Sequence, residues 1–290
     1  MTAVVSPPPA LRNRTRVSSS IPLRMLREGR IHLLPVYALA RTSYLGREGM
    51  ESSGSFRFAD HVYRGRPRGR FIIGWAMDAL FLTLPASRSM RERYLHSRGE
   101  VAAELRRAAA DSRGTRILSV PCGIARELVE AASEVRAEVP SVVERAELIG
   151  MDLDPEPLRL SRALAGEDRA FQFLQRDALQ AATLPESLDL IVSTGFGEFL
   201  DDGELLRFYT ACCSALTPGG RFVTSGMSRS RIADRLLRDI AELHVHYRET
   251  EVLRSALTHA GFTEIAIRAD RFGLQSLVTA RRPDGGGQHV

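Results

Sequence analysis

The pattern of apolar and polar positions changes character near Gly114. Beyond this point, short runs of aliphatic and β-branched residues alternate with stretches whose apolar residues recur every three or four positions. The runs that predict strands are 116–120, 146–151, 171–174, 188–193, 221–224, 262–269 and 274–280. The stretches that predict helices are 124–139, 157–164, 201–216 and 250–260.

This strand–helix alternation predicts an α/β fold with a doubly wound, mostly parallel, seven-stranded sheet covered by helices on both faces. The last two strands follow each other without a helix, so the last strand is expected to be antiparallel. Pro218-Gly219-Gly220 is expected to form a turn that ends the helix before it.

The first hundred residues carry a helical pattern instead. Residues 1–20 are rich in Pro and Ser and predict a flexible tail, 21–47 predict one or two helices, 48–70 a long Gly-, Ser- and Arg-rich loop, and 71–84 a buried helix. A further helix is expected over 89–112, with Val101, Leu105 and Ala109 on one face. We therefore expect a helical cap or lid over 21–100, an α/β domain over 101–282 and a second flexible tail over 283–290.

Composition narrows the class of protein. With 290 residues, 44% hydrophobic and 26% charged, the chain can bury a substantial core, which excludes a disordered, fibrous or disulfide-scaffold protein. No apolar run approaches the ~20 residues of a bilayer-spanning helix, and the N-terminus lacks the apolar segment of a secretory signal. Three cysteines without metal-site spacing favour a reduced, cytoplasmic protein with no metal.

Charge is unevenly distributed. All 40 cationic side chains are arginine, and residues 1–100 hold 17 of them against 7 acidic residues. A basic first third could bind an acidic ligand or a nucleic acid, but a solvated arginine surface explains it as well, and we favour that reading.

Candidate chemistry lies just after the strands, because an open parallel sheet binds ligands beyond the carboxyl ends of its strands. A turn containing Gly123 follows the first strand, Asp152 ends the second, Asp177-Ala178 follow the third, and Ser193-Thr194 end the fourth. A carboxylate such as Asp152 can accept hydrogen bonds from both ribose hydroxyls. Asp154, directly before Pro155, is expected to cap the next helix, which leaves Asp152 for a ligand.

These segments, in this order, resemble the class I S-adenosylmethionine (SAM)-dependent methyltransferases over about residues 90–282. The segments that carry the resemblance are ILSVPCGIARELV, LIGMDLDPEPL, FQFLQRDAL, LDLIVSTGFGEFLDD, LTPGGRFVTS, ETEVLRSALTHAGFTEI and LVTARRP. The chain departs from the family at three positions: Ser119 replaces the usual acid, and Pro121 and Ala125 stand where glycines are common. Proline removes an N–H donor, and the alanine methyl group is expected beside the ligand path.

The resemblance implies a Rossmann-like domain that binds SAM, releases S-adenosylhomocysteine (SAH) and uses no metal. Gly123 and its neighbours would face the methionine portion, Asp152 the ribose and Asp177-Ala178 the adenine. The full set of expected cofactor-binding residues is Ser119, Pro121, Cys122, Gly123, Asp152, Leu153, Asp177, Ala178, Ser193, Thr194 and Arg64.

Glu198, Tyr63 and His246 are the candidate catalytic residues, on the acceptor side of the site. Glu198 could act as a base or orient an acceptor; it could equally begin the next helix, where its charge is favoured. Tyr63 and Arg64, with His61, are placed on the long loop, where a lid could order over the cofactor, or the loop could simply cross the surface. His246 could line the acceptor pocket or end an exposed helix. Phe71, Trp75 and Phe81 are expected in the core.

The sequence therefore predicts a methyltransferase for a small, apolar or aromatic acceptor, of the kind found in secondary metabolism, with O-, N- and C-methylation open. The basic first third suggests an RNA or DNA methyltransferase as an alternative, but no nucleic-acid-binding module is recognisable. The three departures suggest a non-catalytic SAM-binding protein as another. Neither a nucleic acid nor a membrane is an expected partner, and the oligomeric state, a homodimer included, stays open.

Overall fold

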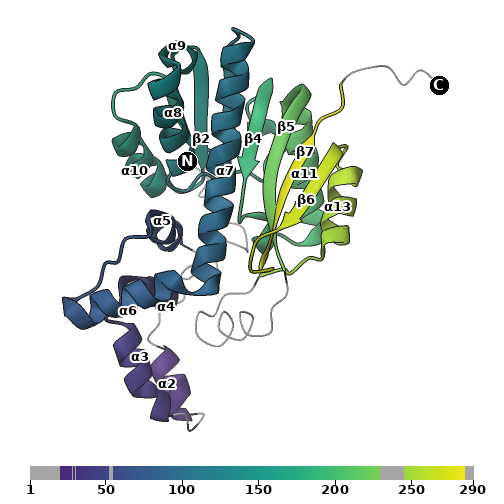
Figure 1. Ribbon diagram of the computed structural model, residues 1–290. Helices are drawn as coiled ribbons and strands as arrows, with labels where there is room; N and C mark the ends of the chain where they lie inside the picture. Colours follow the sequence, from purple (N-terminus) through teal and green to yellow (C-terminus); the bar gives the residue numbers. More distant parts are fainter. Residues whose placement is uncertain (1–19, 28, 30, 52–54, 229–244, 285–290) are drawn as a thin grey trace, which may run out of the picture. The chain divides into compact units, whose positions relative to one another are not determined.

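The computed structural model describes residues 20–27, 29, 31–51, 55–228 and 245–284 (Figure 1). They form two compact units. The helical unit contains the described residues up to Arg91, and the sheet unit contains Glu92–Ser228 and those from His246 onward. The expected N-terminal tail and most of the C-terminal one lie outside the described residues, apart from Ser20, which begins a helix.

The sheet has the predicted seven strands, and their order is β3-β2-β1-β4-β5-β7-β6. Strands β1 to β5 are parallel, and β7 runs antiparallel between β5 and β6. The strands are β1 (Thr115–Ser119), β2 (Ala146–Asp152), β3 (Phe171–Gln175), β4 (Leu188–Ser193), β5 (Leu216–Met227), β6 (Thr263–Ala269) and β7 (Gln275–Arg281). The order reverses between β1 and β4, which is where such sheets bind ligands.

Two apolar clusters cover the faces of this sheet. Because neighbouring strand residues point to opposite faces, Ile117 joins the cluster formed with α7, α8 and α10, whereas Leu118 joins the one formed with α11 and α13. The helical elements are α7 (Pro85–Ala110), α8 (Arg126–Glu138), α9 (Pro140–Glu144), α10 (Pro155–Ala165), η3 (Ala181–Thr183), η4 (Gly197–Phe199), α11 (Asp202–Ala215) and α13 (Thr250–His259). The predicted doubly wound architecture is therefore confirmed.

Two local predictions in the sheet unit need correction. Pro218-Gly219-Gly220 is not a separate turn but part of β5, whose pairing with β4 shifts register between Leu188 and Leu190. The helix predicted over 124–139 begins only at Arg126 and is followed by α9, which Pro140 begins. The predicted cap of α10 is confirmed, because the Asp154 carboxylate accepts a hydrogen bond from the Glu156 N–H at 2.9 Å.

The helical unit contains more helix than the sequence predicts. Its elements are α2 (Ser20–Arg27), η2 (Ile31–Leu33), α3 (Leu34–Ala40), α4 (Tyr44–Glu51), α5 (Phe56–Arg64) and α6 (Phe71–Thr83). The long loop expected over 48–70 is wrong, since α5 occupies its middle. Ser55 caps α5 by accepting from the Phe58 N–H at 3.1 Å, and Gly65, with φ of +59°, ends it.

Helix α6 forms as predicted but is not buried as a whole. Phe71 is 87% exposed and Trp75 54% exposed, so the expectation of core positions is wrong for both. Phe81, in contrast, packs against Leu45 and Val62, as expected. A helix that is apolar on all sides gives no sign in the sequence of which side the fold covers.

A buried carboxylate on α6 connects the segments of the helical unit. Asp78 Oδ1 accepts from Ser43 Oγ at 2.6 Å and from the Leu45 N–H at 2.7 Å. Its Oδ2 lies 2.6 Å from both His61 Nε2 and the Arg68 backbone nitrogen. Burial opposes ionisation, but these hydrogen bonds outweigh it and lower the pKa of Asp78. The predicted lid residue His61 thus has a structural partner.

Among the helices within the described ranges, none is long and apolar enough to cross a lipid bilayer. In the same ranges, no three His, Cys, Asp or Glu side chains converge as metal ligands would. Cys122, Cys212 and Cys213 are all buried free thiols.

Candidate functional site

The loops that follow β1, β2 and β3 meet at the carboxyl edge of the sheet. The Cys122 N–H donates to the Met151 carbonyl at 2.8 Å, which ties the first loop to the second strand. The Arg176 N–H donates to the Asp152 carbonyl at 3.1 Å, which ties the third loop to the same point. The structure thus brings together the residues predicted from these three loops.

Asp152 holds the first two loops together. It is 8% exposed at the end of β2, and its Oδ2 accepts from the Gly123 N–H at 2.8 Å. Its Oδ1 accepts from the Asp154 N–H at 3.0 Å. Each carboxylate oxygen has a second lone pair, so the same group can still accept hydrogen bonds from a ligand. Gly123 has a φ of +51°, a conformation that favours glycine.

The residues expected around an adenine lie beside Asp152. Ala178 is buried, and the Asp177 carboxylate accepts from the Leu179 N–H at 3.0 Å. The Leu153 carbonyl accepts from Gln175 Nε2 at 3.2 Å. Asp177 therefore shapes the loop through its own turn, and Ala178 packs into the apolar cluster on the α11 and α13 face of the sheet.

At the end of β1, Ser119 has an acidic neighbour. Its hydroxyl donates to Glu127 Oε1, on the first turn of α8, at 2.5 Å. Burial raises the pKa of Glu127 to about 7. Pro121 is half-buried on the loop. The expected methyl group beside the ligand path is not found, because Ala125 is fully buried within the apolar cluster of α7, α8 and β1.

Ser193 and Thr194, at the end of β4, are anchored to neighbouring elements. The Ser193 carbonyl accepts from Thr224 Oγ1 at 2.7 Å, and Thr194 Oγ1 lies 3.4 Å from Ser97 Oγ on α7. The next residue, Gly195, donates its N–H to Ser225 Oγ at 2.9 Å. These contacts fix the loop at the switch point of the sheet.

Glu198 lies in the short 3-10 helix η4 and not at the start of α11, which Asp201 caps. Its carboxylate is buried and accepts from Arg93 Nη1 of α7 at 3.1 Å. Burial raises the pKa of Glu198, and the charges of Arg93 and Arg248 oppose that rise. The Arg93 guanidinium also fills the space beside Gly195, where a Cβ would lie only 2.8 Å from its nitrogens.

His246 lies in an irregular segment before α13, next to the Glu198 backbone. Its N–H donates to the Glu198 carbonyl at 2.7 Å. Two residues on, the buried Arg248 donates to the carbonyls of Gly197 at 2.7 Å and Leu200 at 2.6 Å. The structure thus places Glu198 and His246 side by side, and Arg248 holds the loop of Glu198 through two backbone carbonyls.

Tyr63 and Arg64 belong to the helical unit, on α5 rather than on a loop. Tyr63 packs against the cluster of Leu45, Val62 and Leu82, and Arg64 Nη1 lies 3.9 Å from Asp60 Oδ2. Their roles at the cofactor stay predictions.

Sequence reasoning missed Arg93, Glu127 and Arg248. The two arginines are hidden among the 40 of the chain, and Arg93 is 105 positions away from its partner Glu198. Glu127 carried a usable signal, because it is the acidic residue in the first turn of the helix that follows Ser119.

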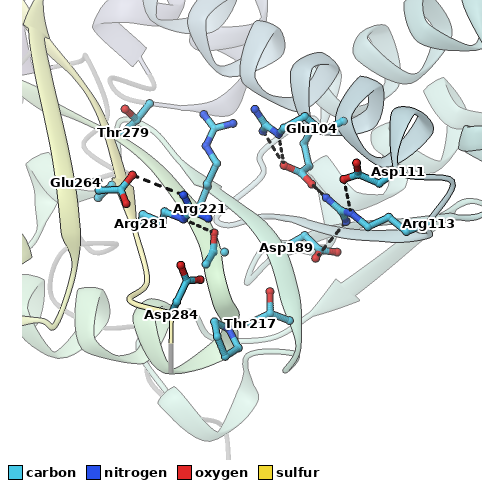
Figure 2. Close-up of a pocket in the computed structure, with 15 residues that line it drawn as sticks. Glu104, Asp111, Arg113, Asp189, Thr217, Arg221, Glu264, Thr279, Arg281 and Asp284 are labelled. Atoms are coloured by element: carbon cyan, nitrogen blue, oxygen red, sulfur yellow. Dashed lines mark hydrogen bonds and ion pairs between the residues drawn. The ribbon is translucent and has the colours of Figure 1, made fainter. Parts of the chain in front are cut away.

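A cavity of about 620 Å³ lies elsewhere, at the amino ends of the parallel strands (Figure 2). Acidic side chains there already pair with arginines: Glu104 accepts from Arg113 at 2.7 Å and from Arg107 at 2.6 Å (Figure 2). Glu264 lies 3.7 Å from Arg281. Because its charges are compensated and the loops after β1, β2 and β4 lie at the other edge, this cavity is separate from the candidate site.

The chain is similar to several proteins of known structure. The chain superposes on a possible exported protein from Bordetella parapertussis with a TM-score of 0.75 at 23% identity, covering 96% of this chain and 100% of the other. It superposes on the apo form of the SAM-dependent methyltransferase SibL with a TM-score of 0.54 at 17% identity, covering 90% and 76%. For magnesium protoporphyrin IX methyltransferase from Synechocystis PCC 6803, bound to SAH, the TM-score is 0.51 at 15% identity, covering 77% and 93%.

These superpositions, at sequence identities of 15–23%, show a shared fold. No curated protein sequence matches the chain. A family model described as "Putative methyltransferase" matches residues 19–282, which is most of the chain and includes both units. The chain belongs to this methyltransferase family.

Proposed function

We propose that the protein transfers a methyl group from SAM to a small-molecule acceptor. The observation that carries the proposal is the buried Asp152 at the end of β2, which accepts a hydrogen bond from the loop after β1. Family membership supports methyl transfer in general. The acceptor class, a cytoplasmic location and a place in secondary metabolism are predictions from the sequence.

The residues present fit this cofactor chemically. SAM carries ribose hydroxyls, an adenine and a positively charged methionine end. The lone pairs of Asp152 suit the hydroxyls, the apolar Ala178 suits the adenine, and the buried Glu127 offers a carboxylate for the charged end. Ala125 is enclosed in the core, so its methyl group does not oppose binding.

SAM supplies a methyl group on a sulfonium, which an acceptor atom attacks in line while the bonding electron pair stays on sulfur. The protein's part is mainly to hold the two reactants in position. Asp152 and the Gly123 loop bind and orient the nucleoside end. Glu198 and His246 lie beside the loop after β4, where Glu198 can hold the acceptor or take its proton.

The test has two stages. Calorimetry of the full chain should show saturable binding of SAM and of SAH. Incubation with isotopically labelled SAM and a metabolite extract should then give, by mass spectrometry, a product heavier by one methylene unit. Absence of SAM binding contradicts the proposal, and binding without turnover on any acceptor favours the non-catalytic alternative.

Glu198→Gln should lower kcat by about two to four orders of magnitude while leaving the affinity for SAM unchanged. In the native protein the rate should rise with pH as Glu198 loses its proton, around a pKa that burial has raised, and the Gln variant should lose this limb. Steady-state kinetics on the identified acceptor measure both effects. The exposed Glu251→Gln serves as control and should keep the native profile. An unchanged kcat in Glu198→Gln would exclude a role in proton transfer.

A further inference from the structure

A side chain from outside β1 places a carboxylate at the end of this strand. Ser119 is the last residue of β1, with Gly150 of β2 and Val192 of β4 as its neighbours across the sheet. The Glu127 carboxylate, from the first turn of α8, accepts from the Ser119 hydroxyl at 2.5 Å. The carboxylate therefore sits at the strand end where the resemblance expects an acid.

In the part of the chain that the structure describes, no arginine or histidine forms an ion pair or hydrogen bond with the Glu127 carboxylate. The charge of the adjacent Arg126 lowers the pKa of Glu127, but Arg126 directs its Nη1 to Glu130 at 3.2 Å, and Tyr94 of α7 donates to the same Glu130 at 2.5 Å. Burial outweighs the charge of Arg126 and disfavours the charged carboxylate, so the site favours a ligand that brings a further positive charge.

We propose that Glu127 and Ser119 together replace the acid missing from β1, and that Glu127 pairs electrostatically with the positively charged methionine end of SAM. This inference rests on the proposed function. Glu127 is a positioning residue in this scheme: the Ser119 hydroxyl orients it, and it sets the charge of the site.

This pairing should make the affinity for SAM depend on pH. The groups that face Glu127 are Arg126 and Glu130 on α8, Cys122 on the loop and Tyr94 on α7. With these neighbours, burial raises the pKa of Glu127 to about 7. A cationic ligand lowers that pKa, so binding should release a proton below pH 7, and affinity should rise as the pH approaches 7. Without ligand, the stability of the folded state should fall as the pH rises from the ordinary pKa of glutamate to about 7, because the unfolded chain loses the Glu127 proton first.

Calorimetry of the full chain with SAM between pH 5.5 and 7.0 tests this pairing. Glu127→Gln should bind SAM about tenfold more weakly at pH 7 and should lose the pH dependence. The double variant Ser119→Asp/Glu127→Gln should regain affinity, because it returns the carboxylate to β1. The control Glu138→Gln, at the other end of α8 where the carboxylate pairs with Arg106, should keep the native pH dependence.

A second measurement uses the unaltered protein, so it does not depend on any variant folding. Titration at pH 6.5 in buffers of different ionisation enthalpy should reveal proton release on SAM binding. If the native protein binds SAM with no proton release and Glu127→Gln keeps both affinity and pH profile, the inference is wrong and the proposed function stands. If the native protein does not bind SAM, both this inference and the proposed function are wrong.

Discussion

Asp152→Ala should weaken SAM binding by at least about 100-fold. The substitution removes an acceptor for two ribose hydroxyls and releases two backbone donors, the Gly123 and Asp154 N–H groups, that the carboxylate now holds. Hydrogen bonds to a charged group contribute about 1.5–3 kcal/mol each, and about 1.4 kcal/mol corresponds to a factor of ten in affinity. Calorimetry with SAM and SAH gives the dissociation constants directly.

The comparison variants separate binding from loop folding. Asp152→Asn keeps one carbonyl acceptor and should fall between the native protein and Asp152→Ala. Asp154→Ala, two residues on, removes the cap of α10 and should cost about 1 kcal/mol of stability while leaving SAM affinity close to native. Native affinity in Asp152→Ala would show that the cofactor binds somewhere else.

Asp78→Ala should destabilise the helical unit by about 3–5 kcal/mol. Asp78 is fully buried and gathers four donors from three segments of the unit, so its loss leaves buried polar groups without partners. Because the chain forms two units, a single unfolding temperature would mix them. Hydrogen exchange at the amides of α4, α5 and α6 measures the effect locally, and it should be much faster in the variant.

The acid dependence follows from the lowered pKa of Asp78. Since the folded pKa lies below the ordinary value, the stabilisation is complete above that value and is lost as the pH falls through the lowered one. Arg64→Gln, which removes the 3.9 Å ion pair to Asp60, should leave exchange nearly unchanged. Equal protection in Asp78→Ala and the native protein would mean that apolar packing alone holds the unit.

The sheet could be predicted from sequence because its strands are short apolar runs separated by amphipathic helices. The segment from Leu188 to Ser193 is an example, with Leu190, Ile191 and Val192 all buried. A strand buried on both faces needs such a run, whatever its neighbours are. The order of the strands was not predicted, because connection lengths and the handedness of crossovers leave several orders open.

The helical unit was harder to predict. Helix α5 lies between Gly- and Ser-rich flanks, and these flanks dominated the composition on which the loop prediction rested. Its core residue Val62 is recognisable only once Leu45 and Leu82, from two other helices, are seen against it. Local composition does not report such contacts.

The candidate site was predictable where it follows from strand ends and unpredictable where distant side chains enter it. Asp152 could be named because a polar residue ends a buried strand. Arg93 could not, since only the fold brings α7 beside Glu198. At the end of β1, the sequence shows that Ser119 stands in place of an acid, but it does not predict Glu127 beside it, because a residue in the first helical turn can point to several places.

The reactivity of the Cys122 thiol should show whether the loop after β1 is attached to β2. It is 7% exposed, it donates to the Gly123 carbonyl at 3.2 Å, and burial beside Asp152 and Glu127 raises its pKa, so the reactive thiolate is scarce. Alkylating reagents should therefore reach it only when the loop detaches transiently from β2. A ligand that bridges the loop and Asp152 should slow that modification, with Cys212 and Cys213 on α11 as an internal reference within the same molecule.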